Sequence, residues 1–534
     1  MKTIYLTTPL YYVNAAPHIG HSYTTIAADA MARFHRLQGR PVFLLTGTDE
    51  HGQKIEQAAA AAGQTPKVFV DAVVERFKSL WLTLNISYDD FIRTTEPRHV
   101  EVVQAVLSRL REEGKLVNAS YQGWYCTPDE TFWTEGELGA AALAKQPPLC
   151  PTCQRPLESA NESGWYLPLR ASQEWLRGFL KAHPRFVQPV GRYNEIVSLL
   201  EQPLPEYLCI TRPKQRVNWG IQVPFSPDHV TYVWFDALLN YITVPGFLRD
   251  PDRFAQLWPA DVHFIGKDIL RHHAVYWPIM LHVLGLRDEQ MPTMIFAHGW
   301  WKIGEQKMSK SLGNIVDPSV VVGQLLKDQP FAADVYRYFV LREVPFGQDG
   351  AFSEDAIFKR LNADLANDLG NLVNRTLTMV QRYSGGAVPV SLPVEQLKMI
   401  GSVASQPLVE QALSLPADVD AAMDQVQFSL ALEHIMELVS KANQFIELAA
   451  PWKLAKAGQQ PELNQVLAIL VGIIRIVATM LGPFMPSVAE SIWRQLGCQG
   501  SRRFQDALRW VALPAGQRVS GPQILFPKLE LKAS

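Results

Sequence analysis

The chain has 534 residues, of which 47% are hydrophobic and 19% are charged, and its formal net charge is −2. This length suffices for about three or four domains, and the composition is that of an ordinary globular protein. The near-neutral charge excludes a strongly basic nucleic-acid binder, so any RNA contact must come from local patches such as Arg212, Lys214 and Arg216. Five cysteines, two of them in a CxxC pair, favour a reducing compartment and are compatible with a metal site.

The N-terminal part is predicted to alternate strands and helices. Residues 3–8 have the β-branched and aromatic content of a strand, and residues 20–37 carry apolar side chains at helical spacing. A second strand is predicted at 42–45 and a second helix at 53–62. Residues 1–114 are therefore expected to form one half of a parallel sheet. Because the chain enters a strand at once, we expect no signal or transit peptide.

The middle of the chain is predicted to interrupt this sheet and then complete it. Residues 115–224 are rich in Pro, Trp and Cys, which is typical of an insertion. Strand–helix alternation returns with a strand-like segment at 230–235, a strand at 262–265 and a helix at 269–284. Residues 225–325 are expected to supply the second half of the sheet.

The C-terminal part is predicted to be helical. Four leucines recur by four, four and three residues along one helix face: Leu361, Leu365, Leu369 and Leu372. We expect a helical domain over 351–515, followed by a tail over 516–534.

Residues 466–480 are nearly all apolar but are not expected to span a membrane. They fall short of the roughly 20 residues that a span needs, and Arg475 at the bilayer centre would cost about 2.5 to 3.5 kcal/mol. A buried bundle helix is the better interpretation.

The most informative residues are His18, Gly20 and His21, at the predicted turn from the first strand to the first helix. Backbone N–H groups and the helix dipole favour phosphate there, and two imidazoles can donate to oxygens whose charge grows during a nucleophilic attack. Gly20 leaves room for a nucleotide against the turn. The alternative is that the histidines only cap the helix. The ligand crevice of such a sheet lies at the carboxyl ends of its strands, where Asp49 and Asp268 also fall.

A second group of cations lies far downstream. Residues 304–310 (GEQKMSK) form a short polar loop after the apolar stretch 294–297. A lysine pair in a loop is usually a solvated surface. Together with the upstream turn, Lys307, Ser309 and Lys310 are interpreted as the other half of a triphosphate clamp.

The chain resembles the methionyl-tRNA synthetases, a family of class I aminoacyl-tRNA synthetases. The resemblance rests on seven segments in the family's order: LTTPLYYVNAAPHIGH (6–21), TGTDEHG (46–52), TYVWFDALLNY (231–241), HFIGKDIL (263–270), KMSKSLGN (307–314), DLGNLVNR (368–375) and APWKLAK (450–456). It implies a Rossmann-like doubly wound parallel sheet, split by a connective insertion with a zinc-knuckle-like segment and followed by an α-helical bundle that binds the anticodon. Residues 326–350 would be a linker that contacts the tRNA stem.

The resemblance implies an ATP-dependent methionine–tRNA ligase. The methionine carboxylate would attack the α-phosphorus of Mg²⁺-bound ATP, giving methionyl-adenylate and pyrophosphate, and initiator or elongator methionine tRNA would then take the acyl group. Without a covalent enzyme intermediate, positioning and charge stabilisation would carry the catalysis. The implied catalytic residues are His18, His21, Lys307 and Lys310. The implied ATP-binding residues are these four with Gly20, Gly266, Asp268 and Ser309.

The methionine site can be argued from chemistry as well. A thioether favours aromatic walls, and an α-ammonium needs a carboxylate, for which Asp49 is the candidate. The candidate walls are Tyr12, Trp234, Tyr241, Tyr276 and Trp277, and the resemblance adds Leu10, Ala237, Ile269 and His273. For any single aromatic residue, core packing is the alternative.

The helical domain would read the anticodon, since single-stranded RNA is recognised by stacking bases on aromatic rings and bonding their edges. By resemblance, Asn371, Arg375 and Trp452 would do so. A purely structural role is the alternative for each.

The insertion departs from the family. Metal-binding relatives often carry two CxxC pairs, whereas this chain has Cys126 and Asp129 in the first pair and Cys150 and Cys153 in the second. Three thiolates and one carboxylate can still form a tetrahedral zinc site. The alternative is a decayed knuckle without metal.

The remaining expectations concern partners. The chain ends soon after residues 525–531, so we expect no C-terminal oligonucleotide-binding fold and a monomer. A cytoplasmic location without membrane contact is expected. The insertion is too small for the editing domain of the isoleucine, valine and leucine enzymes, which are the nearest alternative. A non-catalytic tRNA-binding protein is the alternative outside enzymes.

Overall fold

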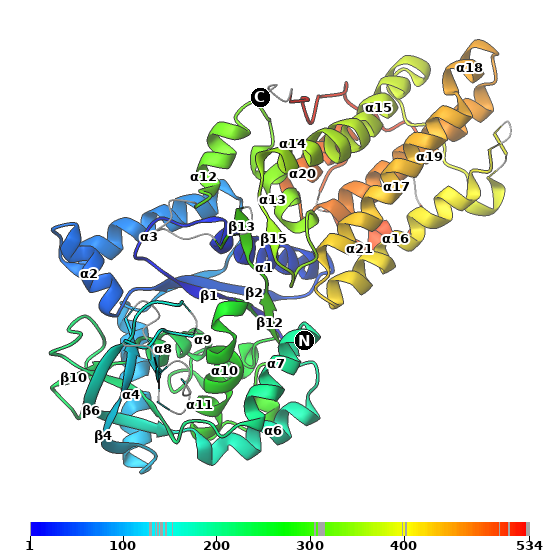
Figure 1. Cartoon of the computed structure of the whole chain (residues 1–534). Helices are drawn as coiled ribbons and strands as arrows, with labels where there is room; N and C mark the ends of the chain where they lie inside the picture. Colours follow the sequence, from blue (N-terminus) through cyan, green and yellow to red (C-terminus); the bar gives the residue numbers. More distant parts are fainter. Residues whose placement is uncertain are drawn as a thin grey trace.

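The computed structural model describes residues 2–127, 131–133, 135, 138, 143–144, 147–151, 153–303, 306–307, 315–397, 399–400, 403–500, 502–510 and 513–529. Asp129, Ser309 and Lys310 lie outside these residues, as does the side chain of Lys307. The described chain has a part built around a parallel sheet and an elongated helical part that extends from one side of it (Figure 1).

Within the described residues, six parallel strands form the central sheet, in the order β3-β2-β1-β11-β12-β7. The strands are β1 (Ile4–Tyr12), β2 (Val42–Asp49), β3 (Asp90–Arg93), β7 (Val187–Gln188), β11 (Val262–Gly266) and β12 (Ile295–His298). β1 lies at the junction, pairing Leu6 with Leu44 of β2 on one edge and with Val262 of β11 on the other. The sheet is thus assembled from two distant halves, which confirms the expected fold class.

Helices cover both faces of the sheet because successive strand residues point to opposite sides. Ile4 and Leu6 belong to the same buried cluster as residues of α1 and α3, whereas Tyr5 between them belongs to a second cluster with residues of α4 and α11. The helices of this part are α1 (Ile19–Leu37), α2 (Gln53–Ala61), α3 (Pro66–Thr83), α4 (Pro97–Glu112), α8 (Val233–Leu238), α9 (Asn240–Thr243), α10 (Pro251–Leu257) and α11 (Trp277–Val283). α1 ends where predicted, before Gly39, whose φ of 79° suits glycine.

Two local predictions are wrong. The segment at 230–235 is not a strand of the central sheet: β10 (His229–Thr231) pairs only with β9 (Thr211–Pro213), and α8 begins at Val233. The β-branched and aromatic residues there suited a strand locally, but packing against the pocket overrides that preference. Arg212 does not belong to a surface patch either, since it is 4% exposed and stacks on the Tyr232 ring at 4.2 Å.

The predicted insertion holds a four-stranded antiparallel sheet of β5-β4-β6-β8. Its elements are β4 (Val117–Cys126), β5 (Thr131–Trp133), β6 (Glu158–Pro168), α6 (Gln173–Ala182), α7 (Val190–Glu201) and β8 (Tyr207–Cys209). Between α6 and α7, the short strand β7 leaves the insertion and pairs with β12 at the edge of the central sheet.

A small sheet includes residues 306–307, the described part of the predicted lysine loop. β13 (Trp301–Ile303) pairs antiparallel with β14 (Gln306–Lys307) and parallel with β15 (Gly350–Ala351). The carboxylate of Asp349 is 2.6 Å from Lys267 Nζ and 2.7 Å from Lys302 Nζ, so it ties β13 to the residue after β11. Burial opposes ionisation there, but these ammonium groups lower the pKa of Asp349 on balance.

The C-terminal part is a helical bundle, as predicted. Its helices are α12 (Pro318–Val320), α13 (Ala332–Arg342), α14 (Glu354–Arg360), α15 (Asn371–Ser384), α16 (Gln406–Asp424), α17 (Phe428–Ala449), α18 (Pro451–Lys456), α19 (Gln460–Leu481), α20 (Pro486–Gln495) and α21 (Phe504–Ala507), with a π-helical stretch over Leu361–Gly370. The four predicted leucines are all fully buried. In the described part of the chain, α19 alone is long and apolar enough to cross a membrane, and 94% of its most apolar window is buried in the bundle. This confirms the predicted buried helix.

A buried ion pair joins the two parts. Arg337 of α13 lies 2.7 Å from the carboxylate of Asp29 in α1, and both side chains are fully buried. The same guanidinium donates to the carbonyl oxygens of Pro483 and Phe484, between α19 and α20. α1 is therefore anchored directly to the helical bundle.

Candidate active site

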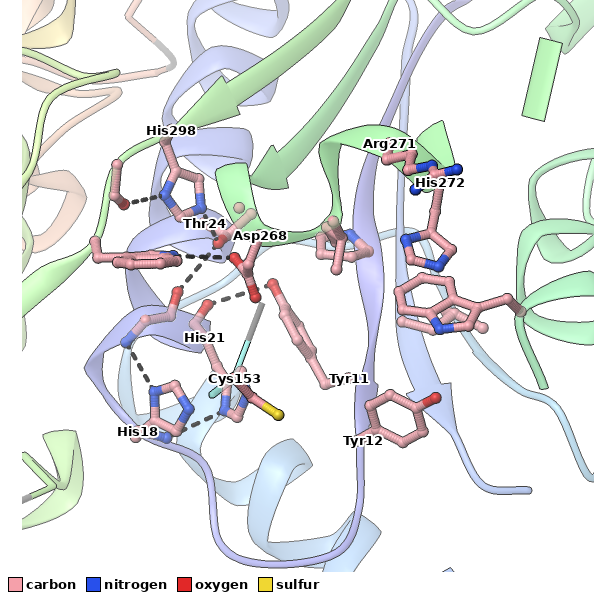
Figure 2. A pocket seen from close by; sticks show the side chains of 18 of the residues that line it. Tyr11, Tyr12, His18, His21, Thr24, Cys153, Asp268, Arg271, His272 and His298 are labelled. Carbon is pink, nitrogen blue, oxygen red and sulfur yellow. Dashed lines mark hydrogen bonds between the residues drawn. The ribbon is translucent and has the colours of Figure 1, made fainter. Parts of the chain in front are cut away.

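One cavity of about 410 Å³ opens at the carboxyl ends of β1 and β11 (Figure 2). This is the edge at which ligands bind in open α/β sheets, and the volume suits a small organic ligand. Ten of the predicted site residues line it: Leu10, Tyr12, His18, Gly20, His21, Trp234, Gly266, Asp268, Ile269 and Tyr276.

His18 and His21 meet at the start of α1. His18 Nδ1 accepts a hydrogen bond from the Gly20 amide at 3.1 Å, and His21 Nδ1 accepts one from the His18 amide at 3.2 Å. Their rings stack with centroids 3.8 Å apart. The pair therefore caps the helix and lines the pocket at the same time. In the neutral rings, an accepting Nδ1 leaves the proton on Nε2.

Gly20 allows the His18 ring to lie close to the backbone at the start of α1. A Cβ at Gly20 would lie 2.9 Å from His18 Cε1, too close for the present ring position. The glycine thus leaves room for the His18 imidazole, and it also lines the cavity.

The opposite wall holds Asp268, just after β11. Its Oδ1 accepts a hydrogen bond from the Trp300 indole at 3.1 Å. A Cβ at Gly266 would lie 2.6 Å from the same oxygen, so glycine is needed for this approach. Asp268 and the histidine pair face the same cavity (Figure 2).

His298 is a pocket residue that the sequence analysis missed. It ends β12, where its Nδ1 donates to the Gly299 carbonyl at 2.7 Å and its Nε2 lies 2.6 Å from Thr24 Oγ1 of α1. Burial lowers the pKa of His298, so the ring stays neutral. A polar residue at the carboxyl end of a strand next to β11 was the signal that could have identified it.

The predicted methionine residues form two layers. Tyr12, Trp234 and Tyr276 line the cavity, and the Trp234 ring stacks on His272 with centroids 3.9 Å apart. The second layer is not part of the cavity lining and is almost fully buried: Asp49, Ala237, Tyr241, His273 and Trp277. Within it, Tyr241 Oη and His273 Nε2 are 2.9 Å apart, and burial lowers the pKa of His273 to about 4. His272 lines the cavity, whereas the predicted residue His273 does not.

Two unpredicted cations also line the cavity. Lys54 Nζ lies 5.0 Å from the centre of the Tyr12 ring, and the Arg271 guanidinium lies 5.3 Å from that of Tyr276. Each follows a quoted motif by one or two residues, which was the available signal.

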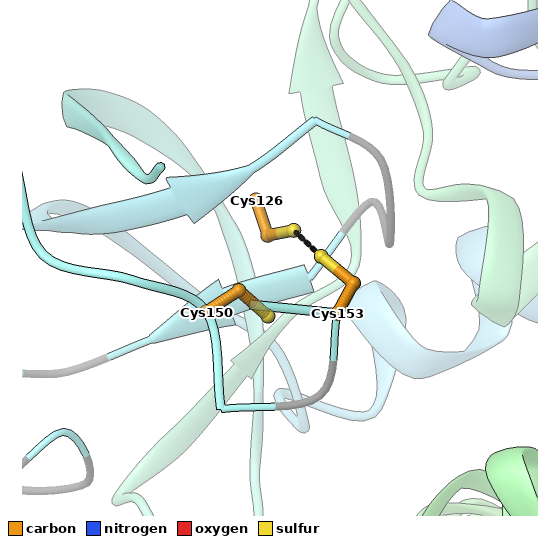
Figure 3. A group of neighbouring side chains, drawn as sticks. All are labelled: Cys126, Cys150 and Cys153. Carbon is orange, nitrogen blue, oxygen red and sulfur yellow. Dashed lines mark hydrogen bonds between the residues drawn. The ribbon is translucent and has the colours of Figure 1, made fainter. Parts of the chain in front are cut away.

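Three cysteines of the insertion lie close together (Figure 3). The Sγ atoms of Cys126, Cys150 and Cys153 all lie within 4.8 Å of one another, and those of Cys126 and Cys153 are 3.4 Å apart. Zinc–sulfur bonds of about 2.3 Å in a tetrahedron would separate the sulfurs by roughly 3.8 Å, so the geometry fits three zinc ligands. Cys153 and Trp133 also line the cavity.

The predicted anticodon residues gather at the far end of the bundle, on α15 and α18 (Figure 1). Arg375 donates to Glu447 at 2.6 Å, and its guanidinium lies 5.9 Å from the centre of the Trp452 ring. Trp452 is 40% exposed, which is unusual for so large an apolar ring. Asn371, one helical turn before Arg375, donates to Asn443 at 3.3 Å.

Comparison with known proteins agrees with this architecture. The family described as tRNA synthetases class I (M) matches residues 4–377, and the anticodon binding domain of methionyl tRNA ligase matches residues 401–533. The methionine–tRNA ligase of Caldanaerobacter subterraneus is 45% identical over 99% of this chain and 80% of the relative. This chain belongs to the methionine–tRNA ligase family.

Other members of the methionine–tRNA ligase family match over their whole length. The Rickettsia conorii enzyme is 41% identical over 99% of this chain and 100% of its own. A Mycobacterium tuberculosis methionyl-tRNA synthetase, solved in complex with methionyl-adenylate, is 40% identical, with a TM-score of 0.90 and coverage of 99% of this chain and 100% of that one. The family covers the sheet, the insertion and the helical bundle together.

Proposed function

We propose that this chain activates L-methionine with ATP and transfers it to the 3′ end of initiator and elongator methionine tRNAs. The observation that carries the proposal is the pocket at the start of α1, where two stacked imidazoles and a helix N-terminus lie opposite Asp268 in a member of this family. Backbone N–H groups and the dipole at that position favour the phosphates of a nucleotide.

In the first step, a methionine carboxylate oxygen bonds to the α-phosphorus of ATP as the bond to the pyrophosphate oxygen breaks. Negative charge grows on the oxygens around phosphorus and on the leaving pyrophosphate. His18 and His21 donate from Nε2 to these oxygens, while Lys307 and Lys310 neutralise the leaving group. Mg²⁺, carried by ATP, neutralises part of the triphosphate charge. Gly20, Gly266, Asp268 and Ser309 complete the nucleotide site.

Methionine would bind between Tyr12, Trp234 and Tyr276, with Leu10 and Ile269 at its side chain. The second layer of Ala237, Tyr241, His273 and Trp277 would fix the depth of the pocket. Asp49 is proposed to attract the α-ammonium group. Support comes from the register of β1 and β2, which pairs Asp49 with Tyr12, a residue that lines the cavity.

The far end of the bundle is proposed to bind the anticodon through Asn371, Arg375 and Trp452. An exposed indole next to a guanidinium provides a surface on which bases can stack. The domain boundaries are proposed to be those predicted from the sequence. The chain is proposed to act as a monomer in the cytoplasm.

The insertion is proposed to hold one structural zinc through Cys126, Cys150, Cys153 and Asp129. The spacing of the three sulfurs supports this proposal. Bound zinc would close the turn that contains Cys150 and Cys153 and so fix Cys153 beside the cavity.

Methionine-dependent ATP–pyrophosphate exchange, followed by charging of methionine tRNA, tests the proposal. Exchange with methionine alone among the amino acids, together with charging, is expected. Exchange with isoleucine, valine or leucine would indicate one of the related enzymes. An absence of exchange despite tRNA binding would indicate a non-catalytic binder and overturn the proposal.

A further inference from the structure

A carboxylate without access to solvent joins three separate parts of the sheet domain. Asp236 of α8 is fully buried, and its Oδ2 lies 2.7 Å from His51 Nδ1, just after β2. Its Oδ1 lies 2.7 Å from Nε2 of His99 in α4. The other nitrogen of His99 lies 3.2 Å from Thr243 Oγ1 in α9. A single carboxyl group thus links the end of β2 to three helices.

The ionised carboxylate is the form that this arrangement favours. Burial alone would raise the pKa of Asp236, but the charge and hydrogen bond of His51, with those of His99, lower it on balance. Both imidazoles then donate to the carboxylate, so each ring is held in one orientation.

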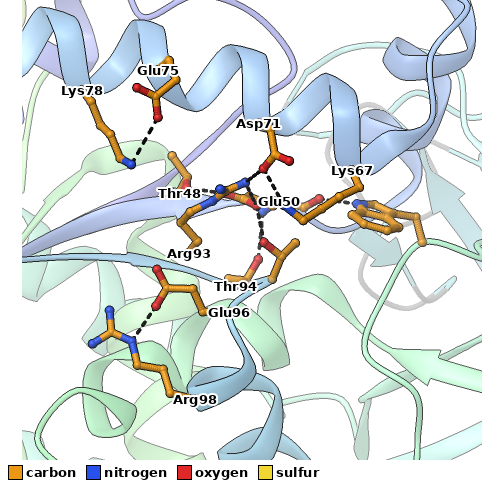
Figure 4. A network of polar contacts seen from close by, with 12 residues as sticks. Thr48, Glu50, Lys67, Asp71, Glu75, Lys78, Arg93, Thr94, Glu96 and Arg98 are labelled. Atoms are coloured by element: carbon orange, nitrogen blue, oxygen red, sulfur yellow. Dashed lines mark hydrogen bonds and ion pairs between the residues drawn. The ribbon is translucent and has the colours of Figure 1, made fainter.

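A second buried carboxylate belongs to Glu50, the residue directly before His51. Glu50 is fully buried and receives two hydrogen bonds from Arg93, at 2.6 Å and 2.9 Å (Figure 4). The hydroxyl groups of Thr48 and Thr95 also donate to it, at 2.7 Å and 2.6 Å. Arg93 continues the network to Asp71 of α3.

These two networks hold residues on both sides of Asp49 along the chain. Its neighbours on both sides, Thr48 and Glu50, are held by the Glu50 network, and His51 is held by Asp236. Asp236 itself lies two residues after Trp234, whose ring lines the cavity, and directly before Ala237. The bond between His51 and Asp236 therefore connects the segment that carries Asp49 to the helix that carries Trp234.

We propose that Asp236, acting through His51 and His99, is a positioning residue that sets the distance between the two sides of the methionine pocket. The inference rests on the proposed function, because it assigns Asp49 to the ammonium group and Trp234 to the side chain of methionine. A pocket that must distinguish one unbranched side chain from others depends on sub-ångström placement of its walls. Hydrogen bonds are directional, so a carboxylate that accepts from both sides restricts the position and the rotation of α8.

Paired variants separate positioning from folding. His51→Asn keeps a donor near the place of Nδ1, and His99→Gln keeps one near that of Nε2, whereas His51→Leu removes the donor. Asp236→Asn replaces one carboxylate oxygen by an NH₂ group, which cannot accept the hydrogen bond of the imidazole N–H that it faces. Asp334→Asn is the matched control, because Asp334 is a buried carboxylate of α13 that accepts from the Val488 amide and does not line the pocket.

The measurements are KM for methionine and for ATP by pyrophosphate exchange, the ratio of kcat/KM for methionine to that for norleucine, and Tm. His51→Leu and Asp236→Asn are expected to raise KM for methionine by about tenfold or more and to lower the methionine preference, with KM for ATP changed by less than about twofold. His51→Asn and His99→Gln are expected to stay within about threefold of the wild type. Asp334→Asn should change neither KM.

Equal changes in both KM values, or the same methionine defect in Asp334→Asn, would overturn the positioning role. If Asp236→Asn does not fold, the comparison of His51→Asn with His51→Leu decides the matter. Failure of the proposed function is distinguishable, because the wild-type protein would then show no methionine-dependent exchange at all.

Discussion

Backbone hydrogen bonds to Nδ1 orient both histidines at the start of α1: the Gly20 amide donates to His18, and the His18 amide donates to His21. Since each Nδ1 accepts a backbone hydrogen bond, each neutral ring carries its proton on Nε2 without any contribution from the ligand. Donors that are oriented before the substrate arrives need no reorganisation during the reaction. This preorganisation accounts for most of the transition-state stabilisation that such groups provide. The cap is thus part of the chemistry proposed for the site.

His21 allows the capping and donor functions to be separated. His21→Asn retains an acceptor near the position of Nδ1 but loses the distal donor, whereas His21→Gln retains a donor near Nε2 and loses the cap. Single-turnover adenylate formation is expected to fall by about 10² to 10³ in His21→Asn, with little change in Tm. His21→Gln should lose more stability and less activity. A wild-type rate in His21→Asn would restrict the ring to capping.

Asp334 gives a prediction for the pH dependence of stability. Burial raises the pKa of Asp334 to about 6, above the ordinary value of 3.8, so the folded protein holds this proton more tightly than the unfolded chain. Its contribution is fully present below about pH 3.8 and is lost as the pH rises through about 6, a change of about 2 to 3 kcal/mol. Because Asp334→Asn does not titrate, Tm of the wild type minus Tm of the variant is expected to decrease between about pH 4 and pH 7. A constant difference would contradict the raised pKa.

At the scale of single elements, the insertion brings its cysteine turn to the edge of the catalytic pocket. β4 and β6 form its long antiparallel pair, Cys126 ends β4, and Cys153 lines the cavity. A structural metal at this turn would therefore affect the shape of the pocket as well as the stability of the insertion.

Purified without chelator, the protein is expected to contain about one zinc per chain. Cys150→Ser should release most of the metal and loosen the insertion while reducing, but not abolishing, adenylate formation. Cys498→Ser, in the helical part, should keep its metal. Elemental analysis that finds no zinc in the wild type would rule out the site and leave the synthetase function untouched.

The elements differ in how far local sequence could predict them. α1 shows a full apolar period and a glycine after its end, so its bounds could be predicted to within one residue. β7 has two residues and no periodic signal, and only its pairing with β12 makes it a strand. Val233 suits a strand by propensity but begins a helix, because packing around the pocket decides its conformation.

The candidate site shows the same division. Tyr12 and Trp277 could both be assigned to the methionine site from their motifs, yet one lines the cavity and the other lies behind it. Depth in a pocket is set by tertiary packing, which a motif does not encode. His298 was missed because a lone histidine at the end of a strand carries no motif of its own.

At the scale of the whole molecule, the two proposed sites lie in different parts of the structure. The pocket is at the carboxyl edge of the sheet, whereas α15 and α18 are at the tip of the bundle (Figure 1). The ion pair between Asp29 and Arg337 connects α1 to the bundle, so the orientation of the two parts is fixed by buried contacts. This separation predicts that RNA recognition and amino-acid activation can be damaged independently.

Trp452→Ala tests this independence. The variant is expected to lower kcat/KM for tRNA charging by about tenfold or more, since stacking on one base is worth about 1 to 3 kcal/mol, and to leave pyrophosphate exchange unchanged. Leu82→Ala is the control, because Leu82 is also exposed but lies on α3 of the sheet domain. Equal losses of charging and exchange in Trp452→Ala would mean that the residue is structural.

The place of β1 in the sheet has a consequence for the order of events during synthesis. Leu6 can pair with Leu44 early, but its other neighbour, Val262, is translated much later. At about 5 to 20 residues per second, the open edge of β1 waits roughly 10 to 50 s for its partner. Unpaired strand edges attract other chains, and the side chains of Tyr5 and Leu6 are among those that end fully buried. The nascent chain is therefore exposed to aggregation for a long interval, which ends only when β11 of the second half of the sheet pairs with β1.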